Sequence, residues 1–307
     1  MTQIRKGVIT AAGRGTRQYP ASKTVQKELF PLVDIDGSAK PTVQLLAEEL
    51  FMSGLEEVCI IANSANSDPM RRHFLEAPPA SLHGKDWADA QTQSLSDMAG
   101  KLTFVVQETQ DGYGHAVYQA REFAAGEPVL ITLGDHVYLS DTDTRCTEQV
   151  LNTFAKYNTS VTSVSYASEA ELHRFGTLSG PLLPGTTPPV YEIKSLVEKP
   201  TVDYARAHLR APGVPDGQYL VHFGIHAFTP AIFECLEFLI ETNQRERGEI
   251  QLTSAQILLM ERERYLACEV AGARYDMGVP EGLIETQIAL ALRGPFASQA
   301  RAILGKL

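Results

Sequence analysis

Short, almost continuously apolar segments alternate with helix-period segments in the first half of the chain, and this alternation restricts the fold more than any other feature. The apolar segments are 7–12, 57–62, 102–106 and 128–133. Strands covered on both faces of a sheet have this composition, because neither face meets water. The alternation predicts an α/β fold with a doubly wound, mostly parallel mixed sheet.

The helices of this alternation follow from apolar spacing. Over 41–53, apolar residues from Val43 to Phe51 recur at i, i+3, i+4 and i+7, and Gly54 suits the helix end. Further helices are expected over 114–124 and 144–156. The mostly polar stretch 77–100 predicts a surface excursion, for which a mobile loop is the simpler reading.

The second half predicts a mixed arrangement ending in a helical tail. We expect strands near 159–166, 190–197 and 219–228, helices near 230–241 and 252–262, and a tail from about residue 280. A chain of 307 residues is close to the largest size that one core supports, and we expect a single domain. Ligands of open α/β sheets bind beyond the carboxyl ends of the strands, so the residues that follow each strand are the candidates for chemistry.

Charge and cysteine content exclude several classes of protein. With 27 basic and 37 acidic residues the formal charge is −10, so neither nucleic acid nor a membrane surface is an expected partner. Residues 1–5 lead directly into an apolar strand and leave no room for a signal peptide, and we expect a cytoplasmic protein. The four cysteines lie far apart without zinc spacing, which predicts buried free thiols.

A basic, glycine-containing loop follows the first strand. Between Arg14 and Lys27 there are four basic residues and no acidic one, beside Gly13 and Gly15. Glycines let backbone N–H groups approach a polyphosphate, and a local positive charge in an acidic protein suits the same ligand. The alternative is an ordinary turn carrying surface cations.

Neither of two familiar phosphate loops matches this segment. A P-loop requires G-x-x-x-x-G-K-[ST], and a dinucleotide fingerprint requires a third glycine where this chain has Gln18. A dinucleotide-dependent oxidoreductase is therefore not expected.

Three consecutive runs carry a resemblance to a known family. They are Gly13 to Arg17 (G-x-G-T-R), Pro20 to Lys23 (P-A-S-K) and Lys27 to Leu32 (K-E-x-x-P-L). In this order they resemble the sugar-1-phosphate nucleotidyltransferases, and among these the bacterial UTP–glucose-1-phosphate uridylyltransferases. Gln26 departs from the family, which usually has proline there. The resemblance implies a Rossmann-like nucleotidyltransferase fold, with 1–140 mainly binding nucleotide, 141–279 mainly binding sugar phosphate, and 280–307 as the tail.

The resemblance also implies roles for residues of the loop and of the segment that begins at Gln107. Arg17 and Lys27 would be catalytic by neutralising charge at the attacked phosphorus. Gln107 and Gly112, in a segment resembling Q-x-x-x-x-G-x-G-H-A-V, would read a pyrimidine, and an amide can both donate to and accept from uracil. His115 of that segment is expected to be structural. The nucleotide-binding residues implied are Ala11, Ala12, Gly13, Gly15, Thr16, Arg17, Gln107 and Gly112.

Two aspartates are the implied ligands of Mg²⁺. Asp135 ends the fourth strand, and Asp276 lies in a D-x-G resembling one near the family's C-terminus. Mg²⁺ prefers oxygen ligands, including one or two carboxylates beside substrate phosphates. By resemblance Asp135 is also catalytic. A helix cap at Asp135 and a plain turn at Asp276 are the alternatives, and His136 departs from the family and is given no role.

Two short runs imply a binding site for the sugar phosphate. Phe175-Gly176-Thr177 and Val197-Glu198-Lys199-Pro200 resemble the Y-G and V-E-K-P segments. Glu198 can accept hydrogen bonds from sugar hydroxyls, while Lys199 offers charge to the 1-phosphate and Gly176 lies close by. A strand-end charge pair is the alternative. The family-like run 248–253 (G-E-I-Q-L-T) is expected only to start a helix and pack.

The expected reaction is the transfer of UMP from UTP to glucose 1-phosphate, giving UDP-glucose and pyrophosphate with Mg²⁺. The same chemistry with dTTP or with another sugar 1-phosphate stays open, as does a non-catalytic sugar-nucleotide sensor. Relatives commonly form dimers or tetramers, so a homodimer or homotetramer is implied, with the tail as a possible interface.

Overall fold

The computed structural model describes residues 3–306, which form two compact units. The first unit contains the residues up to Val8, Thr109–Thr132 and Leu139–Ala273. The second contains Ile9–Glu108, Leu133–Tyr138 and the chain from Arg274 onward. The chain passes between the units several times, so segments distant in sequence belong to one unit.

The second unit contains the predicted strand and helix alternation. Strand β1 (Lys6–Ala11), which enters this unit at Ile9, and strands β4 (Glu57–Ala62) and β5 (Leu102–Val106) are neighbours in the order β1-β4-β5. Strands β4 and β5 pair in parallel from Val58↔Leu102 to Ala62↔Val106. Helix α1 (Thr42–Met52) follows the predicted spacing, and its buried face includes Val43, Leu46 and Leu50. Gly54, at φ 94°, follows the end of this helix as predicted.

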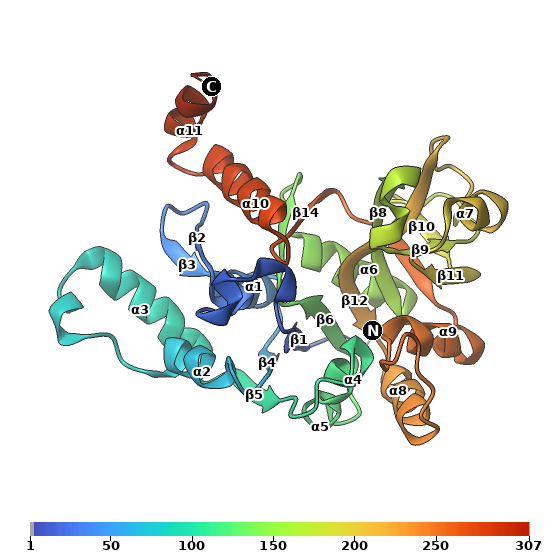
Figure 1. The fold of residues 1–307 in the computed structure, drawn as a ribbon, viewed down its shortest axis with the longest axis horizontal. Coiled ribbons are helices and arrows are strands. Elements are labelled where there is room, and N and C mark those ends of the chain that lie inside the picture. Colours follow the sequence, from blue (N-terminus) through green and yellow to red (C-terminus); the bar gives the residue numbers. More distant parts are fainter. Residues whose placement is uncertain (1–2, 307) are drawn as a thin grey trace. The chain divides into compact units, whose positions relative to one another are not determined.

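The excursion over 77–100 is mostly helical rather than a mobile loop. After α2 (Ser67–Leu75) and a short 3-10 turn at Ala80–Leu82, helix α3 (Asp86–Ala99) returns along α2 (Figure 1). Asp86 and Asp89 lie in the first turn of α3, where negative charge stabilises a helix, and Met98 near its end is buried. The loop interpretation was wrong because few apolar residues mark the helix face.

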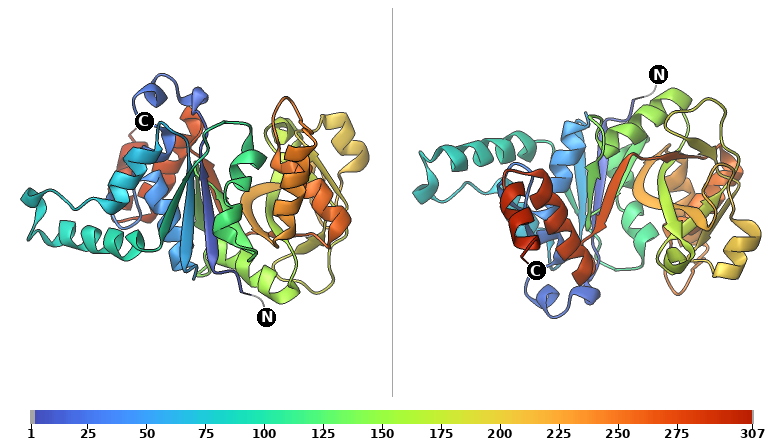
Figure 2. Two further views of the ribbon diagram at one scale, coloured as in Figure 1. Left: turned by 90° about the horizontal axis from the view of Figure 1, so that it is seen from below. Right: turned by 90° about the horizontal axis from the view of Figure 1, so that it is seen from above.

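Two further elements complete this unit. A hairpin of β2 (Pro31–Val33) and β3 (Ala39–Pro41) precedes α1 and was not predicted. The tail from residue 280 is helical as predicted, with α10 (Pro280–Arg293) and α11 (Ala297–Leu304) adjacent to each other (Figures 1 and 2). Helix α10 also contacts strand β2.

The first unit is built on five strands in the order β10-β13-β8-β12-β6. These are β10 (Val190–Glu192), β13 (Leu266–Glu269), β8 (Val161–Ser168), β12 (Gln218–Phe228) and β6 (Val129–Leu133). Strand β12 is antiparallel to both β8 and β6, while β13 and β8 are parallel. Strand β9 (Gly176–Ser179) pairs with β12 and with β11 (Ser195–Glu198). The sheet is therefore mixed, and the predicted α/β class is confirmed.

The helices of the first unit agree with the predicted positions, except for one break and one omission. They are α4 (Tyr113–Tyr118), α5 (Arg121–Ala124), α6 (Cys146–Tyr157), α7 (Val202–His208), α8 (Ala231–Glu241) and α9 (Leu252–Arg262). The helix expected over 114–124 is divided between α4 and α5, and α7 was not predicted. Strands β13, β7 (His136–Ser140) and β14 (Gly272–Asp276), the last two paired together, were also missed because four or five residues show little periodicity.

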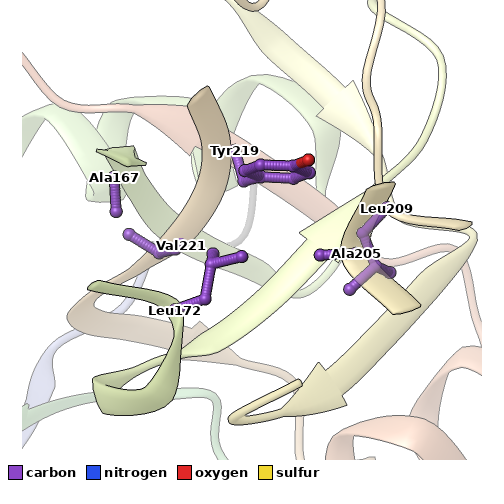
Figure 3. Packing of buried hydrophobic residues seen from close by; sticks show 6 residues of the cluster. All are labelled: Ala167, Leu172, Ala205, Leu209, Tyr219 and Val221. Atoms are coloured by element: carbon purple, nitrogen blue, oxygen red, sulfur yellow. The ribbon is translucent and has the colours of Figure 1, made fainter. Parts of the chain in front are cut away.

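A small apolar cluster supports the ends of β9 and β11. Figure 3 shows its members, which come from β8, the turn after it, α7 with the residue that follows it, and β12: Ala167, Leu172, Ala205, Leu209, Tyr219 and Val221. Phe175 and Val197, which directly precede Gly176 and Glu198, pack against this cluster. The cluster therefore fixes the strand ends that carry two predicted site residues.

The four cysteines are buried and free, as predicted. Among residues 3–306, no helix is long and apolar enough to cross a membrane.

Candidate active site

The predicted phosphate loop leaves β1 and folds back through three short 3-10 turns to Lys27. Ala11 and Ala12 are buried at the strand end, whereas Gly13 is exposed. Gly15 has φ 63°, and a Cβ there would lie 3.2 Å from the Cβ of Ser22. A Cβ at Gly13 would lie 3.4 Å from Lys27 Nζ. The loop therefore places the ammonium of Lys27 beside its own glycines.

Two asparagines after β4, which the sequence did not reveal, hold the start of the loop. Asn66 Nδ2 donates to Ala11 O at 2.7 Å, and Asn63 Nδ2 lies 3.3 Å from both Ala12 O and Gly13 O. Asn66 Oδ1 in turn accepts from the backbone N–H of Asn63 at 2.8 Å. Both side chains are buried. The carbonyls of the loop are therefore fixed on one side by side-chain amides.

Lys27 forms an ion pair with Asp135, which is almost fully buried after β6. Burial alone would raise the pKa of Asp135, but the Lys27 ammonium and the His136 side chain outweigh it and hold this pKa well below its usual range. Burial alone would lower the pKa of Lys27, but Asp135 and Glu28 raise it. Both groups are therefore charged over the physiological range.

Glu28 is the second carboxylate near Lys27, with Oε1 3.7 Å from Nζ. It is buried, and burial raises its pKa to about 8 despite the opposing effect of Lys27. Within the described chain, Glu28 Oε2 is buried and has no hydrogen-bond partner. At neutral pH Glu28 is therefore mostly protonated, and Asp135 is the anionic partner of Lys27.

Asp135, His136 and Asp276 come together in the second unit. One ligand atom from each lies within 4.8 Å of the others, and they form the one group of this kind in residues 3–306. His136 Nδ1 lies 2.8 Å from Asp135 Oδ1, a contact that can orient the carboxylate. Two carboxylates are suitable ligands for Mg²⁺, whereas an imidazole is not its preferred ligand. The two carboxylates thus fit Mg²⁺ as ligands, while His136 contacts Asp135 and would not itself bind the ion.

Gly278 lies among the charged side chains of this group. A Cβ at position 278 would lie 2.7 Å from Asp135 Oδ2, 2.7 Å from Arg17 Nη2 and 2.8 Å from Asp276 Oδ1. Its backbone N–H donates to Asp276 Oδ1 at 2.8 Å. Only glycine leaves this space open, which explains the D-x-G sequence better than a plain turn does.

The loop and the D-x-G turn are joined by two consecutive residues. Gln18 Nε2 donates to Met277 O at 2.8 Å from a buried position. The exposed Arg17 side chain lies with Nη1 3.7 Å from Asp276 Oδ2. Gln18, whose presence excludes a dinucleotide fingerprint, is thus an anchor of the site.

Gln107 and Gly112 fall in different units. Gln107 is buried after β5, and its N–H donates to Ala62 O at 2.8 Å. Gly112 has φ 104°, and a Cβ there would lie 2.6 Å from the carbonyl oxygen of Ile250. Arg245 pairs with Asp111 next to it. Position 112 therefore requires glycine for both its conformation and its packing.

Gly176 and Glu198 are direct partners across the antiparallel strands β9 and β11. A Cβ at position 176 would lie 2.7 Å from His222 Cδ2 and 3.0 Å from Glu198 Oε2. Lys199 Nζ lies 3.6 Å from Glu198 Oε1. The structure thus brings the three predicted sugar-phosphate residues together in the first unit.

The site geometry and the fold define an enzyme of the nucleotide-transferring α/β class, with the predicted phosphate loop, a buried lysine–aspartate pair and a second aspartate. The sequence matches the model of the family described as Nucleotidyl transferase over residues 6–291, and the chain belongs to this family.

Relatives within the family share nearly the whole chain. A protein of Staphylococcus epidermidis named UTP–glucose-1-phosphate uridylyltransferase is 33% identical over 304 residues, covering 97% of this chain and 96% of that protein. A protein of Bacillus subtilis with the same name is 32% identical over 297 residues, covering 95% of this chain and 93% of that protein. The chain is also similar to a crystal structure of UDP-glucose pyrophosphorylase complexed with UDP-glucose. The TM-score is 0.76 at 30% sequence identity, and the match covers 93% of this chain and 98% of that one.

Proposed function

We propose that this nucleotidyltransferase transfers UMP from UTP to glucose 1-phosphate, giving UDP-glucose and pyrophosphate. The observation that carries the proposal is the cluster of Arg17, Asp135 and Asp276 around Gly278, together with the ion pair between Asp135 and Lys27 of the glycine-containing loop. The relatives named UTP–glucose-1-phosphate uridylyltransferase support the choice of substrates.

In this reaction a phosphate oxygen of glucose 1-phosphate attacks the α-phosphorus of UTP, and the bond to the β-phosphate oxygen breaks. No covalent intermediate with the enzyme is needed, so the protein must position two anions and neutralise their charge. We assign triphosphate binding to Ala11, Ala12, Gly13, Gly15 and Thr16. Lys27 and Arg17 neutralise charge at the phosphorus; two unit charges 4 Å apart interact by roughly 4 kcal/mol at an effective dielectric constant near 20.

We propose Mg²⁺ as the cofactor, held by Asp135 and Asp276. Bound there, the ion would supply positive charge to the triphosphate. Asp135 keeps its negative charge to low pH, and Gly278 keeps the space beside both carboxylates free of a side chain. The His136 contact would hold one oxygen of Asp135, leaving Lys27 and a cation to share the other side of the carboxylate.

We assign base recognition to Gln107 and Gly112, and recognition of the acceptor to Gly176, Glu198 and Lys199. The Glu198 carboxylate can accept from two neighbouring sugar hydroxyls, while Lys199 can pair with the 1-phosphate. Uridine and thymidine present the same hydrogen-bonding edge, so a preference for dTTP is the nearest alternative. Another sugar 1-phosphate is a second alternative.

We further propose a homodimer or homotetramer through the helical tail. Ile284 and Ile288 lie four residues apart on one face of α10 and are exposed, as is Ile303 on α11. Exposed apolar side chains at this spacing suit contact with a second copy. The cytoplasmic location stays a prediction from the sequence.

Pyrophosphate release tests the proposal. The purified protein with Mg²⁺ would be given UTP, dTTP, GTP, CTP or ATP together with glucose 1-phosphate, and then UTP with galactose 1-phosphate or N-acetylglucosamine 1-phosphate. We expect rapid release with UTP and glucose 1-phosphate. Faster release with dTTP would support the thymidylyltransferase alternative, and absence of release together with calorimetric binding of UDP-glucose would indicate a sensor.

A further inference from the structure

We propose that Thr253 is a positioning residue for the acceptor sugar, because its hydroxyl fixes the orientation of the Glu198 carboxylate. The inference rests on the proposed function, since it assigns the sugar to Glu198. It also gives a role to the run 248–253, for which the sequence indicated only packing at a helix start.

The contact between the two side chains is direct. Thr253 Oγ1 donates to Glu198 Oε2 at 2.8 Å. Thr253 is buried in the first turn of α9, and α9 packs against β11, whose last residue is Glu198. Both partners are therefore attached to regular elements rather than to loops, and such elements hold a side chain more precisely.

The two oxygens of Glu198 have different surroundings. Oε2 accepts from Thr253 and lies 3.0 Å from the position of a Cβ at Gly176. Oε1 lies 3.6 Å from Nζ of Lys199, whose side chain is more exposed than that of Glu198. With one oxygen fixed by Thr253, the carboxylate cannot rotate freely, and the other oxygen keeps a constant direction toward a sugar hydroxyl.

Backbone strain at Lys199 indicates that this arrangement is held against a conformational preference. Lys199 has φ 48°, a left-handed conformation that residues other than glycine rarely adopt, and it precedes Pro200. Its N–H donates to Phe175 O at 3.1 Å, which continues the pairing of Glu198 with Gly176. Such strain persists only where the surroundings impose it, most often at functional sites.

The same run also supports the segment that carries Gly112. Gly114 N–H donates to Ile250 O at 2.9 Å, and Ile250 N–H donates to Asp111 O at 3.0 Å. A Cβ at Gly114 would lie 2.8 Å from the backbone carbon of Gln251. Residues 250–253 therefore have two sets of contacts. Their backbone atoms contact the segment predicted to recognise the base, and Thr253 contacts Glu198, the carboxylate predicted to bind the sugar.

The experiment compares Thr253→Val with Thr253→Ser. Valine keeps the branched shape and removes the hydroxyl, whereas serine keeps the hydroxyl. We expect Thr253→Val to lower kcat/KM for glucose 1-phosphate by about ten- to hundredfold, the range that misplacement of a substrate-positioning group produces. The KM for UTP should stay unchanged in Thr253→Val. Thr253→Ser, which keeps the hydroxyl, should retain most of the wild-type kcat/KM for glucose 1-phosphate. In a Glu198→Gln background, Thr253→Val should have little further effect.

Calorimetry provides a second readout that does not need turnover. Thr253→Val should weaken binding of UDP-glucose but not of UDP, which lacks the sugar. Equal loss for both ligands, or an unchanged kcat/KM in folded Thr253→Val, would overturn the inference while leaving the proposed function intact. A wild-type protein that neither turns over UTP with any sugar 1-phosphate nor binds UDP-glucose would overturn the proposed function, and this inference with it.

Discussion

Lys27 and Asp135 form a buried ion pair although 108 residues separate them in the sequence. Charge is costly to bury, and a buried pair is retained only when each partner is compensated. Here the lysine is turned toward the glycines of the proposed phosphate loop and the aspartate toward Asp276. The pair therefore joins the loop proposed to bind the triphosphate to the carboxylates proposed to bind Mg²⁺.

Removal of either partner should abolish most activity. We expect Lys27→Ala and Asp135→Ala each to lower kcat by at least about a hundredfold, the scale associated with loss of one preorganised electrostatic group. Lys23→Ala is the matched control, because Lys23 is exposed in the same loop and should be dispensable. Steady-state pyrophosphate release measures all three. Turnover within threefold of wild type in a folded Lys27→Ala protein would remove Lys27 from the mechanism.

Gly278 should tolerate no side chain. Even the methyl group of Gly278→Ala would lie within 2.8 Å of Asp135, Arg17 and Asp276, so the two carboxylates must separate. We expect kcat to fall by at least about tenfold, and the concentration of Mg²⁺ that gives half-maximal rate to rise.

Gly100→Ala is the control for this variant. A Cβ at position 100 would meet nothing within 4 Å, so that variant should have wild-type kinetics. Normal Mg²⁺ dependence in Gly278→Ala would contradict the proposed arrangement of the aspartates.

The two aspartates proposed as metal ligands predict that activity depends on Mg²⁺. Treatment with EDTA should abolish pyrophosphate release, and added Mg²⁺ should restore it. Asp276→Asn should raise the Mg²⁺ concentration required for half-maximal rate by roughly tenfold or more, because one charged oxygen ligand is replaced by a neutral one. Glu281→Gln, an exposed carboxylate in the first turn of α10, is the control. Activity that survives complete chelation would exclude a metal requirement.

Local sequence patterns and the family resemblance predicted the parts of the candidate site that are contiguous in the chain. The loop from Gly13 to Lys27 and the pair Glu198-Lys199 could be proposed because each lies within a short run of the sequence. By contrast, nothing in the sequence near Thr253 indicates Glu198, because the contact depends on how α9 packs on β11.

The missed residues share the same physical reason. Gln18, Asn63 and Asn66 act through backbone carbonyls of other segments, which a linear pattern does not specify. His136 was set aside because it departs from the family, yet its ring contacts Asp135. The fold was more predictable than the site, since periodicity identifies long elements, while short strands such as β7 and β14 depend on tertiary pairing.

If the exposed face of α10 forms the proposed interface between copies, charges on that face should lower the molecular mass of the assembly. Ile284→Asp combined with Ile288→Asp places two charges on the exposed face of α10, and we expect the assembly to dissociate toward monomers. Light scattering after size-exclusion chromatography measures this directly. Ser298→Asp, an exposed change on α11 that removes no apolar surface, should leave the mass unchanged. A wild-type monomer, or an unchanged mass in the double variant, would contradict the proposed interface.

Glu28 predicts how stability depends on pH. Its pKa is raised from the usual 4.5 to about 8, chiefly by burial. Because the folded state keeps a proton that the unfolded chain releases between these values, the free energy of unfolding should fall as pH rises from 4.5 to about 8. At about 1.4 kcal/mol per pH unit, the upper bound of this loss is about 5 kcal/mol.

Glu28→Gln removes this titration while keeping the shape of the side chain. The variant should therefore gain stability relative to wild type as pH rises, with the largest difference above pH 8, because wild type must then bury a carboxylate beside Lys27. Urea unfolding at a series of pH values measures the difference. Glu57→Gln, which alters an exposed carboxylate, should follow the wild-type curve. A constant difference between Glu28→Gln and wild type from pH 5 to pH 9 would show that Glu28 does not titrate in this interval.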